Sequence, residues 1–369
     1  MQHLLAAAAW DEQAVRDDLR GYVVDHLGDP DAVLVVDETG DVKKGITTVG
    51  VQRQYTGTAG RVENAQVGVY LVYATGRGHA FIDRALYMPR SWTDDPARCA
   101  AAGVPDEVRF ATKPTQARTM IARALDAGTP AAWVAADEVY GNDPALRADL
   151  HERGIGYVLA VANDHRITTG IGVRRAIDLA VRLPTAAWQR LSAGAGAKGH
   201  RVYQWALIDT TDPAAAQRAG CHWLLIRRNI RTGELAFYRA HAPRPVPLAT
   251  LVRVAGQRWK IEESFQTGKE LAGLDEHQVR RWTSWHRWTV LAMLAHAFLS
   301  VIAAAEHDPD RPSKDLIPLT RNEIRRLFNG LLTHRVRDTM HHLHWSRWRR
   351  RHQARSRVSH YRRQASALT

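Results

Sequence analysis

Two apolar runs that each end in a pair of acids constrain the fold of this chain more than any other feature. "AVLVVDETG" stops being apolar at Asp37, and "PAAWVAADEVYG" does so at Asp137. A short continuous apolar run is typical of a strand buried on both faces of a sheet. For either aspartate alone, a simple turn cap is the favoured interpretation. Two such strands side by side would bring both acids to the carboxyl edge of a sheet, where sites in α/β proteins collect.

Further segments predict the rest of an α/β fold. An amphipathic helix is expected over residues 11–27. Beyond the first apolar run, two more strands, a helix, the second apolar strand, a helix and a last strand follow in the order "QVGVYLVYA", "HAFIDRALY", "TKPTQARTMIARALDAG", "PAAWVAADEVYG", "DPALRADLHERG" and "IGYVLAVA". This βββαβαβ order indicates a mixed sheet flanked by helices.

The second half has a different pattern. Residues from about 165 to 250 contain "RVYQWALIDTT", "HWLLIRRNI" and "ELAFYRAHA", which predict a β-rich insertion whose last two strands form a hairpin across "RTG". Helical spacing resumes near Leu248 and is expected to continue to Ala305. The apolar run from Trp288 to Glu306 contains His296 and Ser300 and stands alone, so we interpret it as a buried helix rather than a membrane span.

The charge of the chain points to a polyanionic partner. The formal net charge is +13, and no acidic residue follows Asp338, whereas eight arginines do. The polyanion is either nucleic acid or an anionic membrane surface. Trp345, Trp348 and Tyr361 lie among these arginines, which favours nucleic acid binding over a merely solvated basic tail. The two cysteines have no spacing typical of zinc ligands, which fits a reducing cytoplasm and argues against structural zinc.

The segment "RWKIEESFQTGK" places a third carboxylate in a basic setting. At the helical period of 3.6 residues, Glu262 shares one stripe with Arg258 and Lys269, while Glu263 and Lys260 turn away as ordinary surface. An i, i+4 Arg–Glu pair is commonly only surface support. Three converging carboxylates, however, would suit Mg²⁺, and neighbouring Arg and Lys would hold phosphate oxygens.

With these residues in hand, the sequence resembles bacterial insertion-sequence DDE transposases, most closely the IS701 branch of the IS4-like group. The resemblance rests on blocks along nearly the whole chain: "VLVVDETG", "GVQRQYTGTAGRVENAQVGVYLVYA", "FIDRALYMPRSWT", "GVPDEVRFATKP", "AAWVAADEVYG", "RWKIEESFQTGKELAGLDEHQVRRW" and "LIPLTRNEIRRLF". It implies an RNase H-like fold with a catalytic, metal-binding triad of Asp37, Asp137 and Glu262. Two Mg²⁺ ions, with Mn²⁺ as an alternative, are the implied cofactors.

The resemblance also implies DNA contacts. The family signature Tyr-(2)-Arg-(3)-Glu-(6)-Lys is matched by Arg258, Glu262 and Lys269, whereas Ala255 stands at the tyrosine position. Trp259 is a candidate for stacking on DNA, and a core tryptophan under the helix is an equal alternative. In the basic C-terminal region we expect DNA contacts from Arg349, Arg350 and Arg351. The implied partners are transposon inverted-repeat ends and target DNA, bound by a homodimer in the cytoplasm at the nucleoid.

The expected organisation is an RNase H-like core (residues 1–165), a β-rich insertion (166–250), the helical second part of the core (251–310) and a basic, helical C-terminal region (311–369). The expected function is metal-dependent hydrolysis at transposon ends, followed by strand transfer. Relatives generally carry a further N-terminal helical segment. A truncated, inactive remnant that only binds DNA is therefore the first alternative. A nuclease for RNA–DNA hybrids is the second, and a peripheral membrane protein the third.

Overall fold

The two apolar runs form neighbouring parallel strands. The computed structural model describes residues 2–170, 172–196, 199–211, 220–306, 316–333 and 339–366. Strand β1 (Val33–Val42) pairs in parallel with β5 (Trp133–Ala136), and Val36 lies opposite Ala136. The apolar residues before each aspartate, Val33–Val36 in β1 and Trp133–Ala136 in β5, are buried, as predicted for central strands. Asp37 directly follows Val36, and Asp137 directly follows Ala136. The register therefore brings both aspartates to one edge of the sheet.

The strands around this pair form the mixed sheet that the sequence predicted. Strand β3 (Arg61–Ala74) pairs antiparallel with β1 and with β4 (His79–Leu86), while β6 (Gly156–Val161) pairs in parallel with β5. The order β4–β3–β1–β5–β6 is consistent with an RNase H-like fold, so the predicted fold class is confirmed. The short strand β2 (Gln52–Thr56), which pairs with the start of β3, was not predicted.

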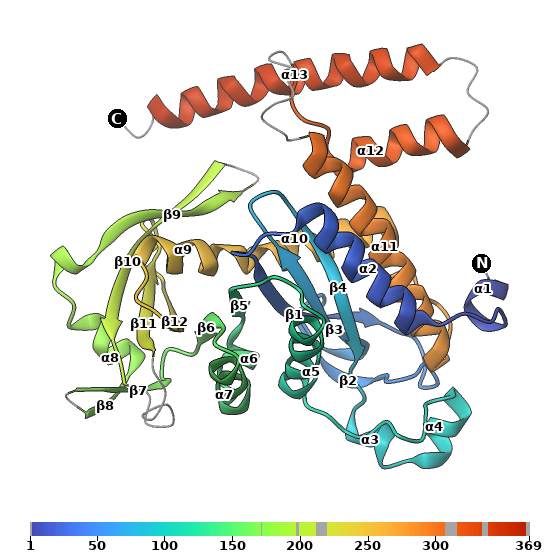
Figure 1. Cartoon of the computed structure of the whole chain (residues 1–369), viewed down its shortest axis with the longest axis horizontal. Helices are drawn as coiled ribbons and strands as arrows, with labels where there is room; N and C mark the ends of the chain where they lie inside the picture. Colours follow the sequence, from blue (N-terminus) through green and yellow to red (C-terminus); the bar gives the residue numbers. More distant parts are fainter. Residues whose placement is uncertain are drawn as a thin grey trace.

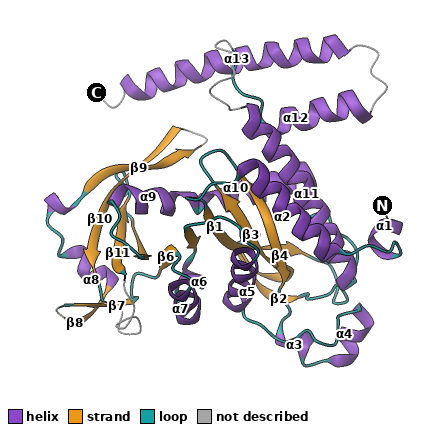
Figure 2. Cartoon of the chain, in the orientation of Figure 1, coloured by secondary structure: helices purple, strands orange, loops and turns teal. Residues whose placement is uncertain are grey.

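The predicted insertion strands continue the same sheet. Strand β12 (Leu235–Ala242) pairs antiparallel with β6 and is followed outward by β11 (Cys221–Arg228) and β10 (Gly199–Asp209). The outermost strand, β9 (Gln189–Gly196), pairs antiparallel with β10 and was not predicted. Figure 2 shows these strands beside the core strands. The β11–β12 hairpin is confirmed. Next to it lie a separate two-stranded sheet and a short helix, made by β7 (Arg166–Thr169), β8 (Gly172–Arg175) and α8 (Ala176–Val181).

Helices pack against the sheet, and three of them begin at a polar N-cap residue. Asp11 caps α2 (Glu12–Leu27), Thr112 caps α5 (Lys113–Asp126) and Asp143 caps α7 (Pro144–Glu152), each with a side-chain oxygen that accepts backbone N–H bonds. All three helices were predicted. Helix α2 packs on β4, α5 packs on β3, and α7 packs on β6. Shorter helices occur at α1 (Gln2–Ala6), α3 (Arg90–Thr93), α4 (Pro96–Ala102) and α6 (Glu138–Gly141).

The prediction of unbroken helical spacing up to Ala305 was wrong. Three helices cover this part of the chain: α9 (Leu248–Gln257), α10 (Trp259–Ala272) and α11 (Trp282–Glu306). Gly273 ends α10 at φ +68°, a left-handed conformation that favours glycine, and residues 274–281 are not helical. Helix α11 is long and apolar enough to cross a membrane, but it packs on β4 and α2, and 56% of its most apolar window is buried.

The C-terminal part stands apart from the sheet. Helix α12 (Arg321–Phe328) packs on α11 and runs into a π-helical turn (Asn329–Thr333). The last helix, α13 (Thr339–Ser366), lies along the top of Figure 1, away from the strands. Trp345 and Trp348 on this helix are each about half exposed. The helix therefore presents aromatic and basic side chains to solvent.

Candidate active site at the sheet edge

Local backbone geometry fixes the two aspartates. The Oδ1 atom of Asp37 accepts a 2.8 Å hydrogen bond from the backbone N–H of Glu38. Asp137 is the N-cap of α6, and its Oδ1 atom accepts a 2.9 Å bond from the N–H of Val139. Asp137 is thus a cap, as the simpler interpretation required. The cap also holds its carboxylate at the sheet edge, next to Asp37.

Arg258 connects the third carboxylate to the first. Its guanidinium lies 2.5 Å from Oε1 of Glu262 and 3.6 Å from Oδ2 of Asp37. Arg258 occupies the junction between α9 and α10, and the next helical turn brings Glu262 onto the same side as Arg258. The structure therefore joins Glu262 to Asp37 through Arg258, and places Asp137 beside Asp37 through strand pairing.

The electrostatics of the aspartates are unfavourable without a cation. Burial, followed by repulsion from Asp137 and Glu38, raises the pKa of Asp37 to about 8. Burial and repulsion from Glu38 raise the pKa of Asp137 to about 6. Oxygen ligands of this kind are those that Mg²⁺ prefers, and a divalent cation would neutralise the repulsion. The donor set therefore fits the divalent metals of DDE nucleases.

Comparisons with known proteins agree with this geometry. Residues 1–170 match the family model of the DDE superfamily endonucleases. The resemblance to DDE transposases is confirmed. A 169-residue stretch is 30% identical to the "Probable transposase for insertion sequence element IS701" of Microchaete diplosiphon. That stretch is 45% of this chain and 41% of the relative, so the chain spans about two fifths of the length of the curated relative that it matches. The family match includes Asp37 and Asp137, whereas Glu262 lies beyond residue 170.

Glu38 is a fourth acid at this edge of the sheet, and no role was predicted for it from the sequence. Its Oε1 atom accepts a 2.6 Å bond from Lys113 Nζ, and its Oε2 atom accepts a 2.5 Å bond from the hydroxyl of Tyr140. These bonds tie β1 to the start of α5 and to α6. A signal for Glu38 was present in the sequence: an Asp-Glu pair ends both apolar strands, and Tyr140 follows the second pair by two residues. Glu38 positions the elements that carry the aspartates.

Two predicted DNA-binding residues lie on α10 near the acids. Lys269 Nζ donates to Thr39 Oγ1 at 2.8 Å, so it sits over β1 two residues beyond Asp37. Trp259 is 44% exposed, and the guanidinium carbon of Arg201 lies 5.9 Å from the centre of its ring. Trp259 is therefore not a core residue. The alternative of a core tryptophan packed under the helix is excluded, and stacking on DNA stays a prediction. An open cavity of about 600 Å³ adjoins Asp137 and Arg258 and is also lined by Arg227.

The C-terminal arginines lie apart from this edge and have different surroundings. Arg349 pairs with Glu323 at 2.6 Å, and Arg350 donates to the carbonyl oxygen of Ile317 at 2.6 Å. Arg351 is exposed. The first two arginines hold α13 against the rest of the molecule in this conformation, so Arg351 is the most accessible of the three.

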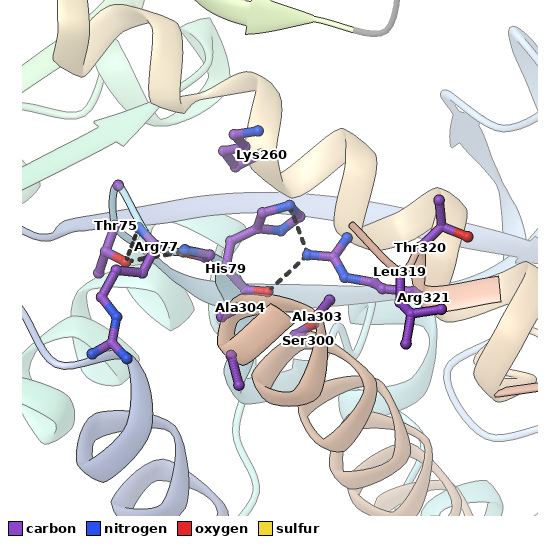
Figure 3. Close-up of a pocket in the computed structure, with 13 residues that line it drawn as sticks. Thr75, Arg77, His79, Lys260, Ser300, Ala303, Ala304, Leu319, Thr320 and Arg321 are labelled. Atoms are coloured by element: carbon purple, nitrogen blue, oxygen red, sulfur yellow. Dashed lines mark hydrogen bonds between the residues drawn. The ribbon is translucent and has the colours of Figure 1, made fainter. Parts of the chain in front are cut away.

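The interpretation of Glu263 and Lys260 as ordinary surface was wrong. Glu263 lies 2.8 Å from Lys260 Nζ and 3.3 Å from Nε2 of His79, which is buried. His79 also receives a 3.0 Å hydrogen bond from Arg321. Figure 3 shows His79, Lys260 and Arg321 at a cavity of about 750 Å³, which lies between the β3–β4 turn, α10, α11 and the start of α12. The helical projection correctly separated Glu262 from this group but missed the partners that neighbouring elements supply.

Proposed function

We propose that the chain is a DDE transposase in which Asp37, Asp137 and Glu262 hold two Mg²⁺ ions, with Mn²⁺ as an alternative. The observation that carries the proposal is the parallel pairing of β1 with β5, which leaves two mutually repelling aspartates at one sheet edge. The Arg258 contacts that join Glu262 to Asp37 support the third position. The DDE family match over residues 1–170 supports the reaction class.

Each side chain then has a defined task. When bound, paired metal ions activate a water molecule and stabilise the charge that develops in phosphoryl displacement. Asp37 and Asp137 provide ligands from rigid strand ends, and Glu262 completes the set from α10. Arg258 balances the carboxylate charge, and its planar group is suited to a bidentate contact with a phosphodiester. Lys269 adds a point charge, and the exposed ring of Trp259 offers a stacking surface for a base.

The proposed sequence of reactions has two displacements at one site. Water first hydrolyses a phosphodiester at a transposon end and releases a 3′-hydroxyl. That hydroxyl then attacks a phosphodiester of target DNA, which forms the new strand junction and releases the displaced 3′-oxygen. We propose inverted-repeat ends and target DNA as substrates, and a homodimer assembled on DNA in the cytoplasm. The exposed, arginine-rich face of α13 would contact the DNA backbone. The four-part organisation with boundaries near 165, 250 and 310 belongs to the same proposal.

Adjacent glutamates on α10 provide a matched test. Glu262→Gln removes a charge from the proposed triad, whereas Glu263→Gln removes one from the group around His79 on the other side of the helix. Both proteins are incubated with Mg²⁺ and a supercoiled plasmid that carries the genomic DNA flanking the gene. We expect Glu262→Gln to abolish nicking and Glu263→Gln to retain it. Gel-shift assays with the same DNA should show similar binding by both variants.

The outcomes separate the proposal from its alternatives. Nicking that survives Glu262→Gln would exclude Glu262 from the triad. Salt-sensitive DNA binding by the unmodified protein, without metal-dependent nicking, would identify a DNA-binding remnant instead. Preferential cleavage of the RNA strand of a hybrid duplex would identify a nuclease for RNA–DNA hybrids.

A further inference from the structure

Three histidines from distant parts of the sequence converge on one point. His151 lies on α7, His222 on β11 and His241 on β12. The β11–β12 register pairs His222 directly with His241, so both rings project from the same face of the hairpin. One ring nitrogen of each residue lies within 4.8 Å of those of the other two. We call these three residues the histidine cluster.

Hydrogen bonds orient two of the rings. Nδ1 of His241 lies 3.1 Å from the backbone oxygen of Cys221, and His241 is only 3% exposed. Donation of the Nδ1 proton to that oxygen fixes the tautomer in which Nε2 carries the lone pair. Nε2 of His151 lies 3.1 Å from the hydroxyl of Tyr157. Such outer contacts, from a carbonyl oxygen or a hydroxyl, are those that fix metal-binding imidazoles.

Ring packing alone is the competing explanation. The centroids of His151 and His241 are 4.1 Å apart, and those of His222 and His241 are 4.7 Å apart. Packed imidazoles repel one another when protonated, whereas a shared cation turns the same arrangement into an attraction. Zn–N bonds of about 2.0–2.1 Å in a tetrahedral site place the nitrogens about 3.4 Å apart. The present spread of up to 4.8 Å thus requires the rings to close by about an ångström.

We propose that the histidine cluster binds one divalent transition-metal ion of the zinc type. Imidazole nitrogens suit Zn²⁺, Ni²⁺ and Cu²⁺, whereas the oxygens of the acid site suit Mg²⁺ and Mn²⁺. The ion would connect helix α7 of the core to the β11–β12 hairpin. The sequence argument against structural zinc applied to cysteine ligands, and it does not exclude three histidines that the fold assembles.

The proposed ion is structural rather than catalytic because of its position. His241 pairs with Tyr157, which in turn lies beside Val134, near the amino ends of the parallel strands β5 and β6. Asp137 follows the carboxyl end of β5, three residues beyond Val134. Three residues of extended chain span about 10 Å, so the cluster and the acids lie at opposite edges of these strands.

Cobalt provides a spectroscopic test that avoids the acid site. Untagged protein with Asp37→Asn and Asp137→Asn is stripped with EDTA, dialysed and titrated with Co²⁺, whose visible absorption reports imidazole coordination. We expect one equivalent to bind, Zn²⁺ to displace it, and thermal unfolding to shift upward by several degrees. Adding His222→Gln should remove the absorption band. Adding His200→Gln, an exposed histidine of the same insertion, should leave the band unchanged.

Two results would overturn the proposal. One is the absence of a Co²⁺ band in the double Asp→Asn protein when its far-UV circular dichroism shows that it is folded. The other is an unchanged band after His222→Gln. If His222→Gln does not fold, His151→Gln on α7 serves as the second variant, and retention of the band there has the same meaning. Neither result depends on DNA cleavage, so the proposed transposase function is tested separately.

Discussion

The acid site lies at the carboxyl ends of the parallel strands β1 and β5, whereas the histidine cluster lies toward the amino ends of β5 and β6. The two sites differ in their electrostatics. At the acid site, buried like charges raise the pKa of Asp37 to about 8, so the folded protein holds an electrostatic strain that a hard cation relieves. In the histidine cluster, ring nitrogens converge between a core helix and an insertion hairpin. Under the two proposals, one edge would serve chemistry at the expense of stability, and the other would attach the insertion to the core.

The largest expected effect tests this division directly. Asp37→Asn should reduce metal-dependent nicking by about a thousandfold or more, because metal catalysis contributes several kcal/mol and each 1.36 kcal/mol is a factor of ten. His222→Gln should leave the nicking rate within about threefold of the unmodified protein. Plasmid nicking measures both. A loss of similar size in the two variants would remove the distinction between the two edges.

DNA affinity should likewise depend on the acid-site edge and not on the histidine cluster. Trp259→Ala removes an exposed ring next to Arg258, and base stacking on an aromatic side chain contributes about 1–3 kcal/mol. We expect the dissociation constant for flanking DNA to rise about tenfold, with an unchanged melting temperature because the ring is exposed. Fluorescence anisotropy at constant salt measures the affinity. An affinity that falls with His222→Gln but not with Trp259→Ala would reverse the assignment of the DNA-binding edge.

The smallest effect concerns the pH dependence of stability in EDTA. Because its pKa is raised from 3.8 to about 8, folded Asp37 binds more protons than unfolded Asp37 across this interval, so its contribution to stability falls as pH rises from about 4 to 8. Asp37→Asn should flatten this decline and raise the melting temperature at pH 8 by about 1–2 °C, as expected for roughly 1 kcal/mol in a chain of this length. Differential scanning calorimetry at pH 5 and pH 8 measures it, and an equally steep decline in the variant would contradict the assigned strain.

The acid site was largely predictable, because its main determinants are local. Burial on both faces makes the apolar runs before Asp37 and Asp137 recognisable as central strands, and helical periodicity selects Glu262 over Glu263. The contact of Arg258 with Asp37 could not be predicted in the same way, because it depends on how α10 crosses the sheet. The break at Gly273 was missed because apolar periodicity on both sides of it looks continuous.

The histidine cluster was not predictable from local patterns. Its members are separated by 71 and 19 residues, since they stand at positions 151, 222 and 241. They meet only because β12 pairs with β6 and its register with β11 sets His222 opposite His241. A one-residue slip in either pairing would turn a ring to the other face of the sheet. Sites of this kind follow from strand register, which the sequence pattern of one strand does not specify.

The pairing of β6 with β12 also has a consequence during synthesis. Strand β6 ends at Val161, whereas its partner spans Leu235–Ala242. The ribosome must therefore make more than 70 further residues before the outer edge of β6 can be covered. At roughly 5–20 residues per second, that edge stays unpaired for several seconds. An open strand edge is a template for association with other chains. The nascent protein thus passes through a period in which aggregation competes with completion of the sheet.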